Sequence, residues 1–392
     1  MSQYPASPDA EGGREIHFPQ VPDPASPPAI ASPSVAQAPI APPPFSPVDD
    51  MPPPSGFMPQ QRFSFHGNGS EYFGIWIVNL VLTIITIGFY APWAKVRRLR
   101  YFYGHTRLAD RAFDFTGIPT KILAGRMIAA AVYFIYAFAG QYSPKMAIAG
   151  FMLLFLVLPW LLRATFRFNA RNSKYSNSRL FFSGSTAQIY KTLLLCLLIM
   201  VFTLGIMTPY AIWLYKRYQF NHLHLGQLDF KLDVDVGRYF SAIYVPYFML
   251  LGIMVVGGLL VGLTGMNFSG GFSAATIAFI AGIYVMMLLI VPLIQARLYK
   301  ATWNHVSLAS NRFACDINQW RYSWIVVSNW LAKIVSFGLL SAWAAVRIYR
   351  YKIESLSVHL INSPNDLLTM ALQDPSAFAE ELTDILDIDV SL

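Results

Sequence analysis

Long apolar runs separated by short basic connectors fill the middle of the chain. A helix needs about 20 residues to cross a bilayer, and seven runs are long and apolar enough to cross or enter one. They are Tyr72 to Ala94, Ile122 to Gly140, Met146 to Leu162, Thr192 to Tyr215, Tyr239 to Gly265, Ala274 to Ala296 and Tyr322 to Val346. The pattern predicts an all-α polytopic membrane protein with about seven hydrophobic helical segments.

The connectors between these runs carry short strand signals. Gln61 to Gly69 alternates aromatic and polar residues before a Gly-Asn-Gly turn, which is typical of a short strand. A strand, turn, strand pattern occurs in four further connectors, at Tyr103 to Gly117, Asn172 to Gly184, His222 to Asp233 and His305 to Asp316. The sequence therefore predicts short β-hairpins at the ends of the helices.

Three of the apolar runs belong to a repeated segment, with cores at residues 62–101, 179–218 and 312–351. Each copy has an apolar run broken at a glycine, then an aromatic residue, then an Arg-Tyr pair, and two helices separate one copy from the next. Repetition of this kind predicts a threefold internal repeat. The break, for example at Gly88 and Pro92, is a place where the chain can bend.

Composition and charge place the chain in a membrane. Of its 392 residues, 55% are hydrophobic and 13% charged, and the mean hydropathy is +0.43; soluble domains have roughly 25% charged residues. The net charge of +8 comes mostly from residues beside the apolar runs, so it indicates membrane anchors and not nucleic-acid binding.

The orientation of the repeated segments is left open by the charge pattern. Positive charge marks the cytoplasmic side of a membrane. If the three repeated segments enter and return on one side, every basic flank and both termini are cytoplasmic. If all seven runs cross once, the basic connectors fall on both sides.

The two ends of the chain differ from its middle, which forms a membrane domain at residues 61–355. Residues 1–60 are rich in Pro, Ala and Ser, which predicts a disordered tail with polyproline II character. Residues 361–392 carry acidic residues and no basic one, and their apolar residues at helical spacing predict a short amphipathic helix that contacts a soluble protein partner or the basic cytoplasmic face.

The most specific segment of the chain is TIGFYAPWAKVRRLRYFYG at Thr86 to Gly104. With its surroundings, about residues 62–355, it resembles the bacterial YjgN-like inner-membrane family, a domain whose biochemical function is unassigned. The resemblance implies a multi-pass protein of the bacterial inner membrane. It supplies no catalytic or ligand residues.

Polar residues inside the apolar runs are the first candidates for a functional site, because a charge in the bilayer centre is costly. Lys333 lies deep in the third repeated segment, one turn after Asn329, which aligns with Asn79 of the first copy, as Lys333 aligns with Thr83. These four residues predict either a polar path through the bundle or interhelical hydrogen bonds with a snorkelling lysine.

The repeated Arg-Tyr pairs supply a second candidate site. Arg100, Arg217 and Arg350 lie where a helix meets the headgroup region, and we expect them to contact anionic lipid headgroups. His222 and His224 share one strand face, but no Cys or carboxylate completes a metal site. The sequence has no catalytic motif, so neither an enzyme nor a cofactor is predicted.

Two function classes follow. Repeat symmetry and the intramembrane lysine favour transport of a small solute or lipid, or a passage for it, through the repeat bundle. The alternative is a non-catalytic structural, assembly or regulatory protein that acts through its cytoplasmic hairpins and tails.

Overall fold

The computed structural model describes residues 60–263 and 274–361. The predictions for the proline-rich tail up to residue 59, for the acidic segment after residue 361 and for the loop between the two helices of the second pair lie outside the described residues.

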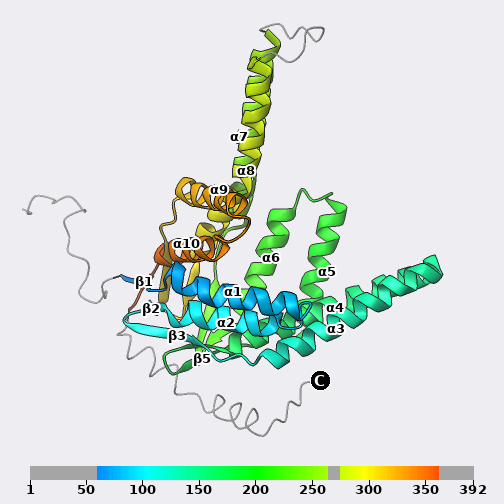
Figure 1. Cartoon of the computed structure of the whole chain (residues 1–392), viewed down its shortest axis with the longest axis vertical. Coiled ribbons are helices and arrows are strands. Elements are labelled where there is room, and N and C mark those ends of the chain that lie inside the picture. Colours follow the sequence, from blue (N-terminus) through cyan, green and yellow to red (C-terminus); the bar gives the residue numbers. More distant parts are fainter. Residues whose placement is uncertain (1–59, 264–273, 362–392) are drawn as a thin grey trace, which may run out of the picture. The chain divides into compact units, whose positions relative to one another are not determined.

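Five successive β-α-α-β units make up the described residues (Figure 1). Unit 1 contains β1 (Gln61–Phe65), α1 (Gly69–Ile85), α2 (Ala91–Gly104) and β2 (Thr106–Leu108). Unit 2 contains β3 (Arg111–Phe115), α3 (Pro119–Tyr142), α4 (Pro144–Arg171) and β4 (Ser173–Tyr175). Unit 3 contains β5 (Ser178–Phe182), α5 (Thr186–Phe202), α6 (Thr208–Asn221) and β6 (Leu223–Leu225). Unit 4 contains β7 (Leu228–Leu232), α7 (Val236–Leu263), α8 (Ala274–Trp303) and β8 (Val306–Leu308). Unit 5 contains β9 (Asn311–Cys315), α9 (Gln319–Val335), α10 (Ser341–Glu354) and β10 (Leu356–His359).

The strands do not stay local hairpins but join into one closed antiparallel barrel, in the order β1-β10-β9-β8-β7-β6-β5-β4-β3-β2. The first and last strands close it, with Gln61 opposite Val358 and Arg62 opposite Ser357. The expectation of an all-α fold with seven helices in a threefold repeat is therefore wrong. Each strand has only 3 to 5 residues, and an isolated two-stranded hairpin is marginal in water, so each hairpin is stabilised by pairing with the next.

Aromatic and aliphatic side chains fill much of the barrel. The third residue of each odd-numbered strand points to the shared interior, at Phe63, Phe113, Leu180, Phe230 and Phe313. Between them lie outward residues such as Asp229 and Lys231, which are exposed. This alternation is the period-2 pattern of a strand with one face in a core.

The three repeated apolar segments are helical hairpins and not single helices. In unit 1, α1 ends at Ile85 and the chain reverses through Ile87 (φ 50°) and Gly88 (φ 88°) before α2 begins with Pro92 in its first turn. The Gly88 N–H donates to the Thr83 carbonyl at 2.7 Å, which closes the end of the helix in the manner of a Schellman motif. Gly205 and Gly338 repeat this geometry. The bend predicted at the glycine break is confirmed.

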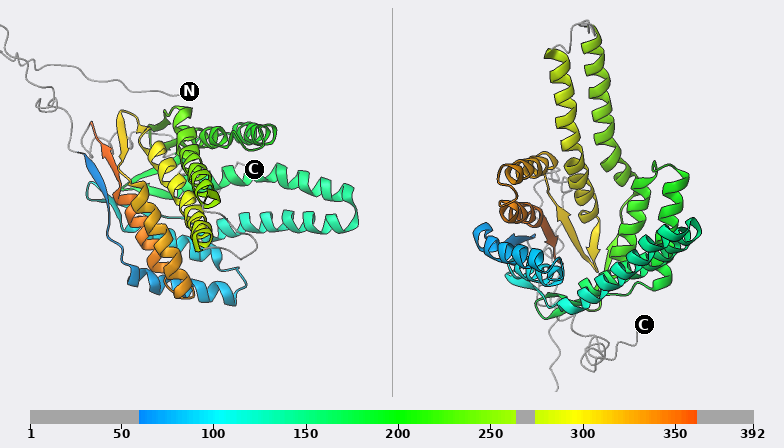
Figure 2. Two further views of the ribbon diagram at one scale, coloured as in Figure 1. Left: turned by 90° about the horizontal axis from the view of Figure 1, so that it is seen from above. Right: turned by 45° about the vertical axis from the view of Figure 1, so that its right-hand side comes forward.

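Within the described residues, four helices are long and apolar enough to cross a membrane: α3, α4, α7 and α8. They form two antiparallel pairs, as Figure 2 shows for α3 with α4 and for α7 with α8. The shorter α1 has 17 residues, about 25 Å at 1.5 Å per residue, and its hairpin returns to the barrel. Because every helix pair among the described residues starts and ends in the same barrel, we expect the flanks of all five pairs to lie on one side of the membrane.

We expect reporter fusions to show this one-sided arrangement. Fusions at residue 60, at the β4–β5 turn near residue 177 and at the β6–β7 turn near residue 226 should report the same side of the membrane, because all three positions lie on the barrel. A fusion at residue 143, between α3 and α4, should report the other side. The check is a paired set of periplasm-active and cytoplasm-active reporters, and opposite signals from residues 60 and 226 would contradict the arrangement.

Candidate functional site: the barrel interior and its helix-side rim

A cavity of about 300 Å³ remains inside the barrel. Every strand contributes to its wall, and Tyr103, Phe220, Tyr299, Trp303 and Tyr349 cover it from the ends of the helices. An eight-stranded barrel is just wide enough for side chains to fill. A ten-stranded barrel is wider, which explains why large aromatic residues leave space here.

The few polar side chains in the cavity wall are already hydrogen-bonded within the protein. The Thr106 hydroxyl donates to the Phe102 carbonyl at 2.7 Å and lies 3.0 Å from the Tyr349 hydroxyl. The Ser173 hydroxyl donates to the Asn169 carbonyl, and the Asn311 amide donates to the Leu308 carbonyl. Burial raises the pKa of Tyr349 to about 12, so its hydroxyl stays neutral at physiological pH. The interior therefore suits an apolar occupant.

Two lysines lie where the return helices meet the barrel. Lys216 of unit 3 aligns with Tyr299 of unit 4 and Tyr349 of unit 5. These two tyrosines line the cavity. Lys352 Nζ lies 5.4 Å from the ring centroid of Tyr299. Burial lowers the pKa of both lysines, and the charge on Lys216 lowers that of Lys352 further. Among the described residues neither has a carboxylate partner.

Two of the four residues predicted to form a polar path, Asn329 and Thr83, make side-chain hydrogen bonds inside their own hairpins. Asn329 is fully buried; its amide donates to the Ala344 carbonyl at 3.1 Å and its Oδ1 accepts from Arg347 at 3.2 Å. The Thr83 hydroxyl donates to the carbonyl of Asn79 at 2.6 Å. Among the described residues no hydrogen bond joins Asn79 or Thr83 to Asn329 or to Lys333, which lies in the last turn of α9.

The second copy of the repeated segment also has a hydrogen bond between its two helices. Cys196, which aligns with Asn79 and Asn329, donates its thiol to the Ala211 carbonyl at 3.4 Å, and Ala211 aligns with Ala344. A polar side chain on the outgoing helix thus binds the backbone of the return helix in units 3 and 5. These contacts favour interhelical hydrogen bonding over a continuous polar path.

The Arg-Tyr pairs hold the helix bases to the barrel. The Tyr101 hydroxyl donates to the carbonyl and accepts from the N–H of Asn68, at 2.8 and 2.7 Å, at the start of α1. Arg100 reaches the next unit, where it donates to the Phe115 and Gly117 carbonyls at 3.2 and 3.3 Å. Arg350 likewise donates to the Gly67 carbonyl of unit 1 at 2.7 Å. These contacts tie neighbouring units together around the closed ring.

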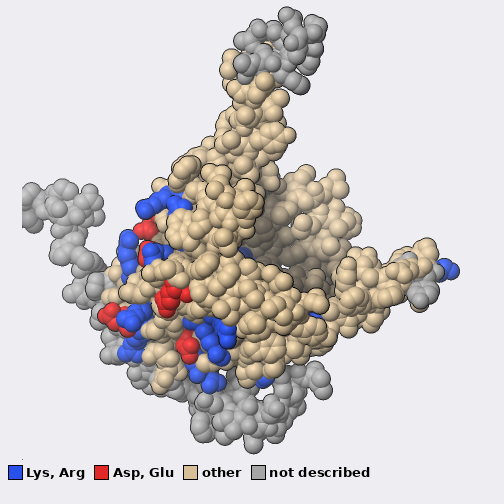
Figure 3. Space-filling view, viewed as in Figure 1, with Lys and Arg blue, Asp and Glu red and all other residues tan. Residues whose placement is uncertain are grey.

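The three predicted arginines are part of a larger set that the threefold reading missed. Six residues before each even-numbered strand the chain has a basic residue, namely Arg100, Arg167, Arg217, Lys300 and Arg350. Figure 3 shows most of the Lys and Arg on this face gathered around the strands and the bases of the helices; a further basic residue lies at the outer tip of the α3–α4 pair, where α4 begins with Pro144 and Lys145. Such a belt beside apolar helices is typical of the cytoplasmic membrane surface. Counting from the strand starts would have revealed it.

Two of these arginines also line surface grooves. Arg350 lines a groove of about 430 Å³ with Arg321, Arg347, Trp324 and Trp343. Arg100 lines another, of about 570 Å³, with Arg97. Arg217 is exposed, with its guanidinium 5.1 Å from the Trp213 ring centroid. Headgroup contacts of the three arginines stay a prediction.

The two paired histidines bind other groups. His224 Nδ1 lies 2.6 Å from Asp229 Oδ1 and its Nε2 lies 2.6 Å from the Ser183 hydroxyl, whereas His222 Nδ1 lies 2.9 Å from the Tyr218 carbonyl. Over the residues that the structure describes, no group of three or more His, Cys, Asp or Glu side chains could hold a metal ion.

Comparison with known proteins agrees with a membrane location. The chain is 33% identical over 108 residues to the inner membrane protein YjgN of Escherichia coli K12, covering 27% of this chain and 26% of that protein. For YjgN of E. coli O157:H7 the identity is 29% over 136 residues, with 34% of each chain covered, and for that of Salmonella typhimurium it is 31% over 98 residues, with 25% of each. The matches thus span about a quarter to a third of these relatives. No solved structure matches the chain.

The family match is much longer than these pairwise matches. A family described as bacterial protein of unknown function (DUF898) matches residues 60–385, which include the barrel and all five helix pairs. With relatives named as inner membrane proteins and four helices that can cross a bilayer among the described residues, the chain is a multi-pass inner-membrane protein. It belongs to the DUF898 family of YjgN-like proteins.

Proposed function

We propose that this protein binds the apolar part of a membrane lipid inside the barrel and gives it passage between the bilayer and the barrel's own side of the membrane. The apolar cavity of about 300 Å³ carries this proposal. This volume lies at the lower end of the range for ligand pockets. A cavity with apolar walls does not hold ordered water well and can bind apolar ligands.

A lipid fits the interior better than a polar solute does. The polar atoms of Thr106, Ser173 and Asn311 are engaged by the protein, so a polar solute would lose its water without gaining partners, which costs several kcal/mol. The hydrogen bonds of Asn329 and Cys196 within their hairpins also leave the bundle without a demonstrated hydrophilic route. Both observations favour lipid passage.

The proposal predicts that filling the cavity removes binding. Leu225 is 5% exposed and lines the cavity from β6, so Leu225→Trp should lower photo-crosslinking by a diazirine fatty acid about tenfold, equivalent to about 1.4 kcal/mol. Proteoliposomes containing the variant should also release a fluorescent lipid to acceptor vesicles on the barrel's side more slowly than wild-type ones.

The matched control is Lys231→Trp, which adds the same ring to an exposed position on the neighbouring strand β7. Leu308→Trp, from the wall formed by β8, repeats the test, and thermal unfolding shows that each variant is folded. Unchanged crosslinking in both cavity variants, or wild-type proteoliposomes that behave like empty ones, would contradict lipid passage. The second outcome would favour the structural or regulatory alternative.

A further inference from the structure

A second site lies outside the barrel, where units 4 and 5 meet. A cleft of about 460 Å³ is lined by Arg238 at the start of α7, by Arg297 and Lys300 near the end of α8 and by Gln319 and Trp320 at the start of α9. The described residues that line it include no Asp or Glu. The cleft is thus a basic recess between the bases of two helix pairs.

Arg297 of this cleft is held in place by hydrogen bonds, and the positive charges of the cleft are not neutralised by carboxylates of the described residues. Arg297 donates to the Gln319 side-chain oxygen at 3.2 Å and to the Ser241 carbonyl at 3.3 Å, so it bridges α8 to α9 and α7. Within the described residues neither Arg238, Arg297 nor Lys300 forms an ion pair with a carboxylate. Three like charges close together repel one another, and a bound anion removes that repulsion.

A shallow apolar groove, with a free volume of only about 10 Å³, continues from the basic cleft towards the outer part of the helices. Arg297, Gln319 and Trp320 line both depressions. Beyond them the groove is lined by Pro246 and Met249 of α7 and by Met286, Ile290 and Leu293 of α8. α7 and α8 are apolar enough to span the bilayer, so this groove faces the acyl chains while the basic cleft lies nearer the barrel.

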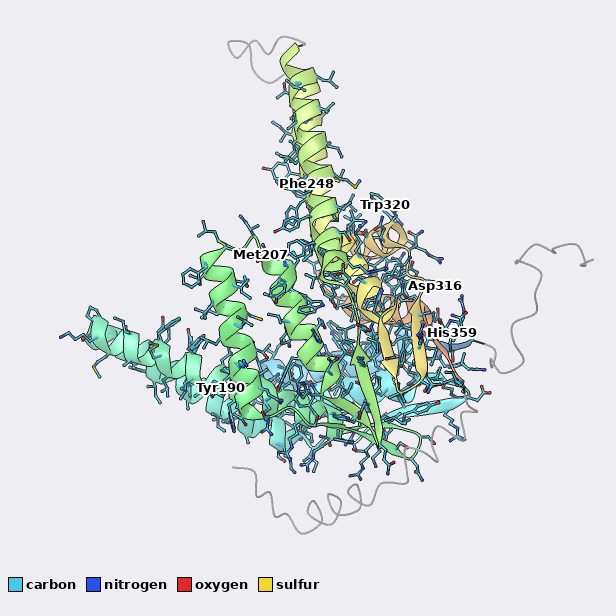
Figure 4. All side chains as sticks on the ribbon, turned by 180° about the vertical axis from the view of Figure 1, so that it is seen from behind. Tyr190, Met207, Phe248, Asp316, Trp320 and His359 are labelled. Atoms are coloured by element: carbon cyan, nitrogen blue, oxygen red, sulfur yellow. The ribbon has the colours of Figure 1, made fainter. Side chains whose placement is uncertain are left out.

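Trp320 marks the boundary between the two parts. Its side chain is 49% exposed, and Figure 4 shows it at the base of α9, with Phe248 of α7 farther from the barrel. Tryptophan is enriched at the level of the headgroups. The order along α7 and α8 is therefore barrel, basic cleft, interfacial tryptophan, apolar groove.

We propose that this composite site binds an anionic phospholipid, with its phosphate in the cleft of Arg238, Arg297 and Lys300 and an acyl chain lying along the apolar helix surface beside the shallow groove, over Met249 of α7. Basic pockets between membrane helices on the cytoplasmic side recognise anionic lipid headgroups. A free phosphate would make no contact with the apolar groove. A zwitterionic lipid carries no net negative charge, so three cations would attract it less than they attract an anionic lipid. The site is separate from the barrel cavity and does not depend on the proposed passage function.

Native mass spectrometry of the full-length protein in detergent tests the proposal, with phosphatidylglycerol, cardiolipin and phosphatidylethanolamine as probes. Wild-type protein should prefer the two anionic lipids. The triple substitution Arg238→Gln, Arg297→Gln and Lys300→Gln should weaken their binding roughly 100-fold, from about 1 kcal/mol per basic residue, and leave phosphatidylethanolamine binding nearly unchanged. Met249→Trp, which fills the groove, should weaken the binding of anionic lipids with long acyl chains more than the binding of those with short chains.

The matched control changes three exposed basic residues on the barrel wall, Arg107→Gln, Lys231→Gln and Arg312→Gln, and should keep the lipid preference. Equal binding of anionic and zwitterionic lipids by the wild type, or equal loss in the control, would overturn the proposal. Two results together would overturn the lipid assignment: millimolar inorganic phosphate displaces phosphatidylglycerol, and Met249→Trp has no effect on lipid binding. The site would then bind anions in general. Crosslinking of the diazirine fatty acid to Leu225 neighbours stays intact in the triple variant, which separates the two proposals.

Discussion

Replacing Gly117 by valine should destabilise the barrel by about 1–3 kcal/mol, the usual cost of overpacking a core. A Cβ atom at Gly117 would overlap Phe115 Cε1 and lie 2.8 Å from Phe115 Cζ. Phe115 is 1% exposed, so its ring has nowhere to move. Thermal unfolding in detergent should show a lower midpoint for Gly117→Val, whereas Gly74→Val is the control for valine in place of glycine, since a Cβ atom there meets no neighbour within 4 Å.

The five units supply their own rescue experiment. Where the fifth strand residue is phenylalanine, the residue two places later is glycine, as in Phe115 with Gly117; in unit 4 the same two positions hold Leu232 and Val234. Phe115→Leu should therefore make Gly117→Val less costly, with a coupling energy of at least about 1 kcal/mol in a double-mutant cycle. Additive effects of the two substitutions would show that the ring is not what the glycine accommodates.

Replacing Asn329 by leucine should cost about 1–3 kcal/mol, whereas the same change at the aligned Asn79 should be neutral or stabilising. The substitution removes the hydrogen bonds of Asn329 to the Ala344 carbonyl and the Arg347 guanidinium. Hydrogen bonds to charged groups contribute more to stability than those between neutral groups. Asn79 is 7% exposed and, over the described residues, its Oδ1 has no hydrogen-bond partner, so leucine removes a desolvation cost there.

Chemical unfolding of the two variants side by side measures this difference. Because Asn79 and Asn329 occupy the same place in units 1 and 5, differences in helix propensity between Asn and Leu cancel. Equal destabilisation by both substitutions would show that the residues have the same role, as the polar-path prediction requires.

Local features of this fold could be predicted from the sequence, and non-local ones could not. The glycine breaks, the short hairpins and the basic flanks depend on residues close in the chain, so Gly88 and the pattern around Arg111 were enough to find them. Closure of the barrel depends on pairing between Gln61 and Val358, which no local pattern encodes. The cavity follows from closure, so the sequence pattern placed Phe63 in a single short strand and Phe313 in a distant hairpin, without bringing the two together.

The sequence pattern predicted three repeats, whereas the described residues form five units, and the reason is related. Units 1, 3 and 5 share the glycine break and the Arg-Tyr pair, but units 2 and 4 have longer helices and hold Arg167-Phe168 and Lys300-Ala301 where the Arg-Tyr pair stands. A comparison by letters therefore found three copies. A comparison by position relative to the strands, for example of Arg167 with Lys300, is what relates the remaining two units to them.

Closure of the barrel by β1 and β10 also sets an order of events during synthesis. Four of the five units can pair with the preceding one as each leaves the ribosome, because β2 to β9 bond neighbours that come just before or after them in the chain. β1 has to wait for a strand made at the very end, and until then its unpaired edge is open to other chains. A chain that ends before β10 therefore forms an open sheet whose edge strands, β1 and β9, are unpaired and can pair with the strands of other chains.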